Sequence, residues 1–427
     1  MQGCSHRGCR EYRDLSRRRF IKTGAAAAAL AGAPVWLPRV AYAQNEVSDR
    51  DVIIAVFLRG GADGLTLCVP HGDDNYYAAR PTLNIPRPDS NSPFAAIDLD
   101  GFFGVPQTFA GLMDAYAAGD LLIVHACGSP DESRSHFQSM TVMETGQGPD
   151  PTVFTGWLGR HLASSDPRNP TAVLRAVGIN EALQRSLSGS PLALPIPDLA
   201  DFGLDGWNVT MQERLQTLGA SYAQGPSALR ATAANTITTI GLLNAIDFVN
   251  YQPGGGAAYP DTHFGYSMKS AAALIKADLG VEAIAIDLDG WDTHDGQGSR
   301  SGWMAGLMTE LGDSLGAFHA DLSAATGKGF VVVVMSEFGR VVMENASQGT
   351  DHGHGGALLV LGNHIAGGRV LTDWPGLGQG ELFQGQDLDT TIDYRDILAE
   401  IVHYRLGNSA LSTVFPGYAP VYRGVTA

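Results

Sequence analysis

The strongest constraint on this chain is a series of short apolar runs that alternate with stretches of helical spacing. The runs lie at Asp51–Leu58, Leu121–His125, Val281–Leu288, Phe330–Met335 and Ala357–Leu361. Because strands that are apolar on both faces suit a sheet covered on both sides, these runs indicate buried, largely parallel strands. Helical spacing predicts helices over residues 210–249, 266–277, 302–324 and 394–406. The sequence therefore predicts an α/β fold with a mainly parallel sheet sandwiched between helices.

The first 43 residues carry the features of an export signal. Ser16–Lys22 contains a twin-arginine box, Thr23–Ala33 is an alanine-rich apolar stretch, and Ala41-Tyr42-Ala43 is a small-x-small cleavage site. Glycine and proline interrupt the apolar stretch, which is therefore too short for a permanent membrane anchor. The alternative is an alanine-rich helix after a basic tail. We expect a twin-arginine signal peptide over residues 1–43 and a periplasmic or secreted domain over residues 44–427, with a loop-rich insertion around 148–206.

The charge of the chain limits its partners. The formal net charge is −16 for the full sequence, and removal of the first 43 residues, with eight Lys or Arg and two acids, makes it −22. A surface this acidic repels phosphate backbones and anionic lipids, so nucleic-acid binding is disfavoured. The expected partners are an anionic ester substrate or an envelope polymer, with no integral membrane segment after cleavage. An anionic substrate would need a local arginine cluster or a metal to overcome the overall charge.

Two of the four cysteines, Cys68 and Cys127, lie beyond the predicted cleavage site. An oxidising compartment would permit a disulfide between them. Their apolar neighbours suit two buried thiols equally well. The sequence leaves both alternatives open.

Side chains of the kinds that bind metals stand at the ends of the predicted strands. They are Asp63, Asp292, His294, Glu337, His352 and His354. In open α/β sheets, ligands bind beyond the carboxyl ends of the strands, so we expect these side chains to meet at one edge. A set of imidazoles and carboxylates suits a divalent metal, zinc first and manganese, calcium or iron as alternatives, although a site without metal is the remaining option.

Each of these residues also has a purely structural explanation. Asp63 fits a turn among glycines, Asp292 a helix N-cap, and Glu337 an ion pair with Arg340 three residues on. Histidines in exposed loops commonly have no role. The joint occurrence of so many candidates at strand ends nevertheless favours a functional cleft.

A second group of candidates stands at Ser133–Phe137, where the sequence predicts the start of a helix. A serine in the first turn lies near the positive end of the helix, which favours a nucleophile facing a phosphate or sulfate. Ser135, Arg134 and His136 are the catalytic candidates, with Arg134 as an anion clamp. The alternative is that Ser133 or Ser135 is an ordinary N-cap.

Several segments together resemble the uncharacterised exported family called domain of unknown function 1501. They are Phe57–Gly64, Arg134–Phe137, Thr155–Arg160, Gly290–His294, Ser336–Arg340 and Asp351–Gly355. That family is similar to the alkaline phosphatase and sulfatase superfamily. The resemblance implies an alkaline phosphatase-like fold with metal ligands at the strand ends.

The same resemblance implies roles for individual residues. Asp63 matches the acid that follows the first strand, Ser135 the nucleophile at a helix start, and Asp292 with His294 a loosely matching ligand pair. A further ligand histidine is matched by His352 or His354. The family pattern of Asp-His after the strong late strand is replaced here by Glu337-Phe338, which puts a full two-metal site in doubt.

These observations lead to two functional hypotheses. The first is an exported metal-dependent hydrolase of a phosphate or sulfate ester. The second is a non-catalytic phosphatase-like scaffold that binds an envelope polymer or a protein partner, and the aromatic ring of Phe338 in place of an imidazole motivates it. Carbohydrate processing by a metal-dependent enzyme is a third, less favoured hypothesis.

Overall fold

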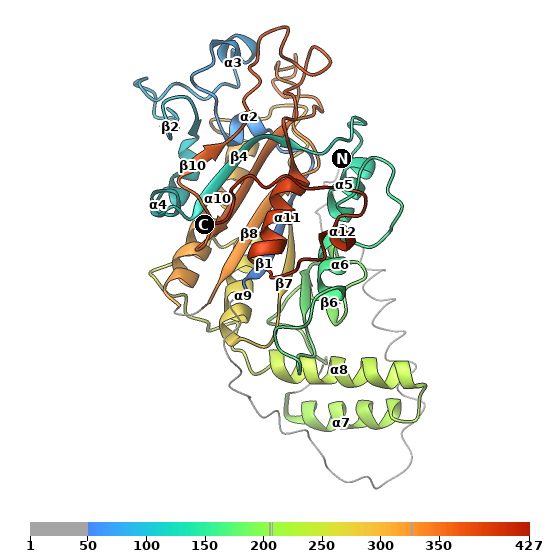
Figure 1. Ribbon diagram of the computed structural model, residues 1–427. Coiled ribbons are helices and arrows are strands. Elements are labelled where there is room, and N and C mark those ends of the chain that lie inside the picture. Colours follow the sequence, from blue (N-terminus) through green and yellow to red (C-terminus); the bar gives the residue numbers. More distant parts are fainter. Residues whose placement is uncertain (1–49, 205, 207, 326–327) are drawn as a thin grey trace, which may run out of the picture. The chain divides into compact units, whose positions relative to one another are not determined.

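The computed structural model of the protein describes residues 50–204, 206, 208–325 and 328–427 (Figure 1). The chain forms two compact units. The larger unit comprises Glu46–Asp201 and Ile246–Ala427, and the described part of the smaller one is residues 202–245 with its gaps. The predicted signal segment, residues 1–43, lies outside the described residues.

The smaller unit is a helical hairpin. Helix α7 (Met211–Tyr222) follows the 3-10 helix η3 (Asn208–Thr210) and packs against α8 (Ser227–Leu243). The helical prediction for residues 210–249 is therefore confirmed as two helices rather than one. Gly225 and Pro226 separate them, since proline has no backbone N–H to donate and stands as the N-cap of α8.

The larger unit contains a nine-stranded sheet whose order is β10-β4-β9-β8-β1-β7-β5-β6, with β11 pairing β4. The strands are β1 (Val52–Arg59), β4 (Leu121–Gly128), β5 (Ala176–Ile179), β6 (Ala193–Pro195), β7 (Ala283–Asp289), β8 (Phe330–Ser336), β9 (Gly356–Gly362), β10 (Arg369–Leu371) and β11 (Ile392–Asp393). All pairings are parallel except those of β9 with β4 and β8. The α/β class and the mainly parallel sheet are thus as the sequence predicts.

Two features of the sheet differ from a simple parallel arrangement. Strand β9 is antiparallel because it pairs directly with β8, the strand before it in the chain, with no crossover helix between them. The loop-rich region around 148–206 also adds β5 and β6 to one end of the sheet. These strands have four and three residues, too few for a periodic sequence pattern to reveal them.

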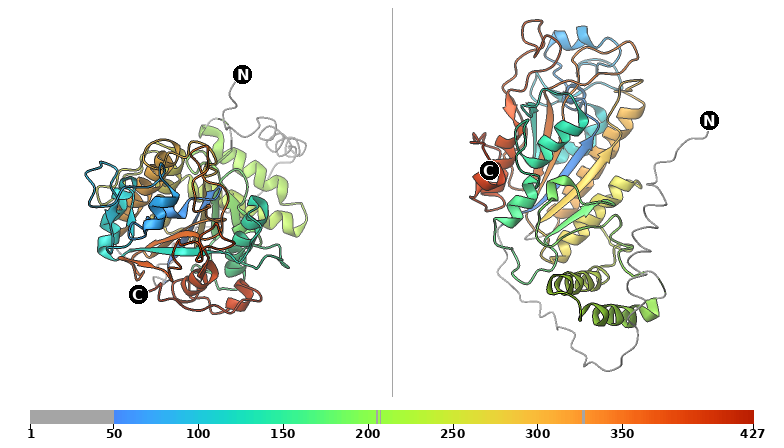
Figure 2. Two further views of the ribbon diagram at one scale, coloured as in Figure 1. Left: turned by 90° about the horizontal axis from the view of Figure 1, so that it is seen from above. Right: turned by 90° about the vertical axis from the view of Figure 1, so that its right-hand side faces the viewer.

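Helices cover both faces of the sheet. On one face, α5 (His136–Thr145), α6 (Trp157–Ala163), α11 (Tyr394–Tyr404) and α12 (Leu411–Val414) contribute to a buried cluster with Ile53, Ala55 and Phe57 of β1. On the other, α9 (His263–Ala277) packs on β7 and α10 (Trp303–Ser323) packs on α9; these are the yellow and orange helices in Figure 2. The side chains of a strand alternate between its two faces, so β1 is buried on both.

The remaining elements are short and lie around the ends of the strands. They are α2 (Gly64–Leu67), α3 (Asp74–Ala79), the two-stranded β2 (Ile97–Asp98) and β3 (Gly104–Val105), η1 (Gln107–Leu112), α4 (Met113–Ala118) and η2 (Arg185–Leu187). None of the helices in the described part of the chain is long and apolar enough to cross a membrane. Cys68 and Cys127 are both buried free thiols.

The register of the central strands decides which loops meet. Leu58 pairs with Leu288 on one side and with Ser336 on the other, so the segments that follow β1, β7 and β8 leave the sheet side by side. Strand β9 begins at the same edge, because Gly356 pairs with Cys127 near the end of β4. Five loops therefore converge at this edge of the sheet.

Candidate functional site

Three imidazoles surround the carboxylate of Asp292 at this edge. The Nε2 atom of His294 lies 3.0 Å from Asp292 Oδ1, that of His352 lies 3.1 Å from the same oxygen, and that of His136 lies 3.5 Å from Oδ2. Ligand atoms of His136, Asp292 and His352 all lie within 4.8 Å of one another, a grouping that could hold a metal ion. His294 lies at the edge of this grouping, and its Nε2 atom is 2.9 Å from the Nε2 atom of His352.

The opposite nitrogen of each ring is bound to a hydrogen-bond acceptor. His136 Nδ1 lies 2.7 Å from Glu337 Oε1, and His294 Nδ1 lies 2.8 Å from Asp351 Oδ1. His352 Nδ1 lies 2.9 Å from a backbone carbonyl, that of Arg134. A carbonyl or ionised carboxylate can only accept, so each Nδ1 carries the proton. In a neutral ring the lone pair is then on Nε2, directed at the shared centre.

This arrangement has the chemistry of a ligand shell. Two Nε2 lone pairs 2.9 Å apart repel one another unless a proton or a cation lies between them. In a shell with metal–nitrogen distances of about 2.1 Å, neighbouring ligand atoms are roughly 3.0 Å apart in octahedral and roughly 3.4 Å in tetrahedral geometry. The contacts of the three rings with Asp292 and of His294 with His352 are 2.9 to 3.5 Å, which brackets these values. Orientation of ligand imidazoles by carboxylates and carbonyls is also the usual arrangement around protein metals.

Arg340 fixes the central carboxylate. This fully buried guanidinium donates to Asp292 Oδ1 at 2.9 Å, to Gly61 O at 2.6 Å and to Thr350 O at 2.8 Å. Partial desolvation opposes ionisation of Asp292, but the hydrogen bond and the positive charge of Arg340 outweigh it, and the pKa of Asp292 is lowered to about 2. Asp292 is therefore an anion at neutral pH.

Glu337 orients His136 rather than facing the shared centre. It is buried, and its Oε1 atom also accepts the backbone N–H of Gly60 at 2.9 Å. Burial would raise the pKa of Glu337, but the bond from His136 and nearby backbone donors lower it. The same bond raises the pKa of His136 against the effect of burial. Glu337 and His136 thus form a carboxylate–imidazole pair next to Asp292.

The cluster is open to solvent on one side. The side chains of Asp292 and His294 are 48% and 42% exposed, and those of His136 and His352 are 25% and 22% exposed. Structural metal sites are usually closed by four protein ligands, whereas catalytic sites keep a position for water or substrate. The exposure of this cluster matches the second kind.

Two glycines allow the loops to approach so closely. Gly60 has a φ of +122°, and a Cβ atom there would lie 2.5 Å from Asp292 N. A Cβ atom on Gly353 would lie 2.3 Å from the carbonyl carbon of Arg340. Any larger residue at either position would push apart the loops that carry the ligands.

Arg134 is tied to a buried acid instead of facing the cluster. Its Nε atom donates to Asp387 Oδ2 at 2.8 Å and its Nη2 atom to Gln384 Oε1 at 2.9 Å. Its backbone has a φ of +50°, the left-handed region that a side chain disfavours. Because its carbonyl accepts from His352, the side chain holds a strained residue in the position that orients a candidate ligand. The sequence-based role of Arg134 as an anion clamp does not fit this pairing.

Ser135 is the N-cap of α5, yet its side chain makes no capping hydrogen bond. The neighbouring hydroxyls differ, because Ser133 Oγ donates to Asp131 Oδ2 at 2.7 Å and Ser139 Oγ also bonds that oxygen. Ser135 stands between Arg134, whose backbone carbonyl accepts from His352, and His136, whose ring faces Asp292. Of these serines, Ser135 has the hydroxyl that is not committed to Asp131.

Asp63 and His354 are engaged elsewhere. Asp63 is fully buried, and both its oxygens accept from the Arg80 guanidinium, at 2.9 Å for Oδ1. Burial opposes ionisation of Asp63, but Arg80 lowers its pKa overall. His354 is buried against the ring of Phe383, 4.3 Å between centroids, and burial lowers its pKa. Neither residue belongs to the group around Asp292.

Sequence reasoning did not identify the partners that orient the rings. Asp351 is named in the sequence analysis only as part of the segment Asp351–Gly355, although an acid beside a histidine pair is a signal for such a partner. No sequence pattern around Asp387 indicates a role for this acid in the site. Its importance arises from a contact with Arg134, 253 residues away in the sequence.

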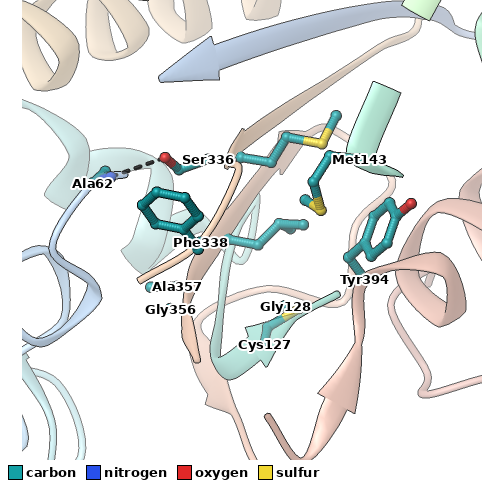
Figure 3. A pocket seen from close by; sticks show the side chains of 11 residues that line it. Ala62, Cys127, Gly128, Met143, Ser336, Phe338, Gly356, Ala357 and Tyr394 are labelled. Atoms are coloured by element: carbon teal, nitrogen blue, oxygen red, sulfur yellow. Dashed lines mark hydrogen bonds between the residues drawn. The ribbon is translucent and has the colours of Figure 1, made fainter. Parts of the chain in front are cut away.

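The interior behind the cluster is closed. Phe338 packs against His136 and His352, with ring centroids 5.0 and 4.7 Å apart, and is almost fully buried. Figure 3 shows its ring beside Ala62 and Ser336, at the edge of a cavity that Met143 and Tyr394 line from the other side. The cavity, about 10 Å³, has room for one water molecule at most. A ligand larger than water could therefore reach the cluster only from the solvent side.

We expect Asp63→Asn to destabilise the protein without removing a ligand, because it leaves the buried Arg80 charge unpaired. The cost should be about 3–5 kcal/mol in the free energy of unfolding, measured with urea. Asp74→Asn is the control, since Asp74 forms an exposed ion pair with Arg87 and should cost less than about 1 kcal/mol. Equal stabilities of the two variants would contradict the structural role of Asp63.

The Asp63–Arg80 pair also predicts an acid dependence. The pKa of Asp63 is lower in the folded than in the unfolded chain, so the stability it contributes is present above about pH 4, the unfolded value, and is lost as the pH falls through the folded value. Asp63→Asn should remove this part of the slope of stability against pH. An unchanged slope in the variant would show that other acids cause it.

We expect Asp387→Asn to weaken metal binding through His352. Loss of the ionic partner of Arg134 should loosen the carbonyl that orients this ring, and the loss of such an outer partner typically costs about 10–100-fold in affinity. Competition with a chromogenic zinc chelator measures the effect. Asp389→Asn is the control, since its Oδ1 atom accepts, among the described residues, from the neighbouring Thr390 N–H. Equal affinities in both variants would refute the positioning role.

Residues 250–408 match the model of a family described as "Protein of unknown function (DUF1501)". The matched segment includes Asp292, His294, Glu337 and His352, whereas His136 lies before it. A comparison with curated proteins finds no match. The family match supports the family resemblance that the sequence motifs indicate.

Proposed function

We propose that the protein is an exported metal-dependent hydrolase of a phosphate or sulfate ester. The observation that carries this proposal is the set of three imidazoles whose Nδ1 atoms are all bound to acceptors and whose Nε2 atoms all face the Asp292 carboxylate. A buried structural network would not leave such a group half exposed. A catalytic metal centre requires that exposure.

Zinc fits the donor set best. Three imidazole nitrogens and one carboxylate match its borderline preference, manganese and iron fit next, and calcium prefers an all-oxygen set. A bound divalent cation would polarise the ester and lower the pKa of its nucleophile. Asp292, His136 and His352 would bind it, with His294 on the rim.

The residues of the chain would supply the rest of the chemistry. Arg340 keeps Asp292 ionised and in place. Ser135 is the candidate nucleophile, because its hydroxyl is not used as a cap and stands at the positive end of α5, where a developing anion is stabilised. Glu337, Asp351 and the Arg134 carbonyl hold the three rings against rotation.

The resemblance to the alkaline phosphatase and sulfatase superfamily would place a second imidazole where Phe338 stands. Phe338 fills this position with a ring packed on His136 and His352. We therefore propose a mononuclear site on an alkaline phosphatase-like fold. The twin-arginine features of residues 16–43 support export to the periplasm or the medium.

We expect the protein, purified after folding in the cell, to contain one equivalent of metal per chain. Asp292→Ala, His136→Ala and His352→Ala should lose it, because each removes a ligand atom from the shared centre. His263→Ala, which changes an exposed histidine at the start of α9, should retain it. Elemental analysis measures the metal content. Metal-free wild type, even after incubation with zinc, would refute the site.

We expect the metal-loaded protein to hydrolyse p-nitrophenyl phosphate or p-nitrophenyl sulfate. Removal of the metal with a chelator should lower the rate at least about 100-fold, and Ser135→Ala should do the same with its metal retained. Ser133→Ala is the matched control, since that hydroxyl is committed to Asp131. A metal-loaded protein that turns over neither ester would instead favour the non-catalytic scaffold.

A further inference from the structure

A cavity of about 340 Å³ lies beside the cluster. One wall of the cavity is formed by the segment 296–302, through its glycines, two serines and Arg300. The rest of the lining consists of Thr82, Leu83 and Gln348. Its volume is in the range of small-molecule sites, which begins at about 300 Å³. It is distinct from the small cavity behind Phe338.

The cavity adjoins the His294 side of the cluster. Gly296 follows His294 by two residues, so their Cα atoms are within roughly 7 Å of each other. The two walls are joined by backbone hydrogen bonds from Gly296 N to Ser347 O and from Gln297 N to Gln348 O, both 2.9 Å. One wall of the cavity is therefore part of the same loop as Asp292 and His294.

Arg300 gives the cavity a positive charge that the structure does not compensate. Its Nε and Nη2 atoms donate to Asn84 O and Asn84 Oδ1, at 2.5 and 2.8 Å, and both partners are neutral. Within the described residues, no carboxylate forms an ion pair with Arg300, whereas Arg80, Arg134 and Arg340 are each paired with an acid. In a chain of net charge −16, such an arginine suits an anionic ligand.

Glu344 lies next to the wall that Thr82 and Leu83 form, and its carboxylate oxygens accept hydrogen bonds from these two residues. Glu344 accepts from Thr82 N, Thr82 Oγ1 and Leu83 N at 2.8–3.2 Å. Asp295 is exposed and is not among the residues that line the cavity. Among the residues that line the cavity, Arg300 is the one with a charged side chain.

The rest of the lining suits a hydroxylated ligand. Ser299 Oγ accepts from Gln297 Nε2 at 3.1 Å, which leaves its own proton for a ligand, and Ser301 and Gln348 are exposed. Trp303 is not among the lining residues, but it follows the lining segment directly and is 63% exposed, with its indole N–H bonded to Gly290 O at 2.7 Å. Its large apolar face would be available to a part of the ligand that extends out of the cavity.

We propose that this cavity is the substrate subsite of the proposed hydrolase and binds an anionic sugar unit, whose charged group contacts Arg300. The inference rests on the proposed function for its link to catalysis, but the binding itself does not require turnover. It also supplies the anion-binding arginine that the pairing of Arg134 with Asp387 removes.

Ligand-observed NMR with the chelated, metal-free protein tests binding apart from hydrolysis. The probes are glucose 6-sulfate, glucose 6-phosphate and glucuronate, with glucose and inorganic sulfate for comparison. We expect at least one charged sugar to bind the wild type at least ten-fold more tightly than glucose or inorganic sulfate. Arg300→Gln should abolish this preference. Arg369→Gln should not, because the Arg369 side chain likewise bonds neutral carbonyls in the described part of the chain, those of Ala366 and Gly424.

A second variant guards against a folding defect in Arg300→Gln. Ser301→Trp changes an exposed residue and should block the cavity, with the same loss of binding. Equal binding of charged sugars by the wild type and Arg300→Gln, equal binding of glucose or inorganic sulfate, or no binding of any charged sugar would overturn the subsite. Arg300-dependent binding without ester turnover would retain the subsite and refute only the hydrolase.

Discussion

The buried guanidinium of Arg340 is the interaction on which the site depends. It donates hydrogen bonds to three loops at once: the loop after β1, the loop after β7, and the loop between β8 and β9, to which Arg340 itself belongs. An arginine can do this because its fixed fork presents five N–H donors in one plane. Without it, four backbone carbonyls and the Asp292 carboxylate would lose a shared donor. The loops that carry Asp292 and His352 are therefore held together by one side chain.

Much of the fold could be predicted from the sequence, and for a clear physical reason. Strands β1, β7 and β8 are buried on both faces, so almost every residue in them is apolar and the pattern is visible without context. Strands β5 and β6 have only four and three residues, too few to show a pattern, and their pairing at the end of the sheet makes them strands. The direction of the strands alone was enough to predict the edge of the sheet at which the polar side chains lie.

The candidate site could be predicted by residue type but not by role. Asp292, His294, His352 and Glu337 stand where a parallel sheet brings them together, yet only coordinates separate a residue that faces the centre from one that orients a ring. Glu337 and His136 are 201 residues apart in sequence, and no local pattern encodes that contact. Asp63 shows the reverse, since its partner Arg80 lies 17 residues on and turns an expected ligand into a structural ion pair.

The cluster is built from loops that span residues 60 to 354, nearly the whole described chain. Its candidate ligand atoms come together only when the sheet is complete, so a metal would be bound after folding and would not guide it. Under the proposed twin-arginine export, which moves folded proteins, the ion would be chosen from the cytoplasmic metal pool. The identity of the metal would then reflect where the chain folds more than where it works.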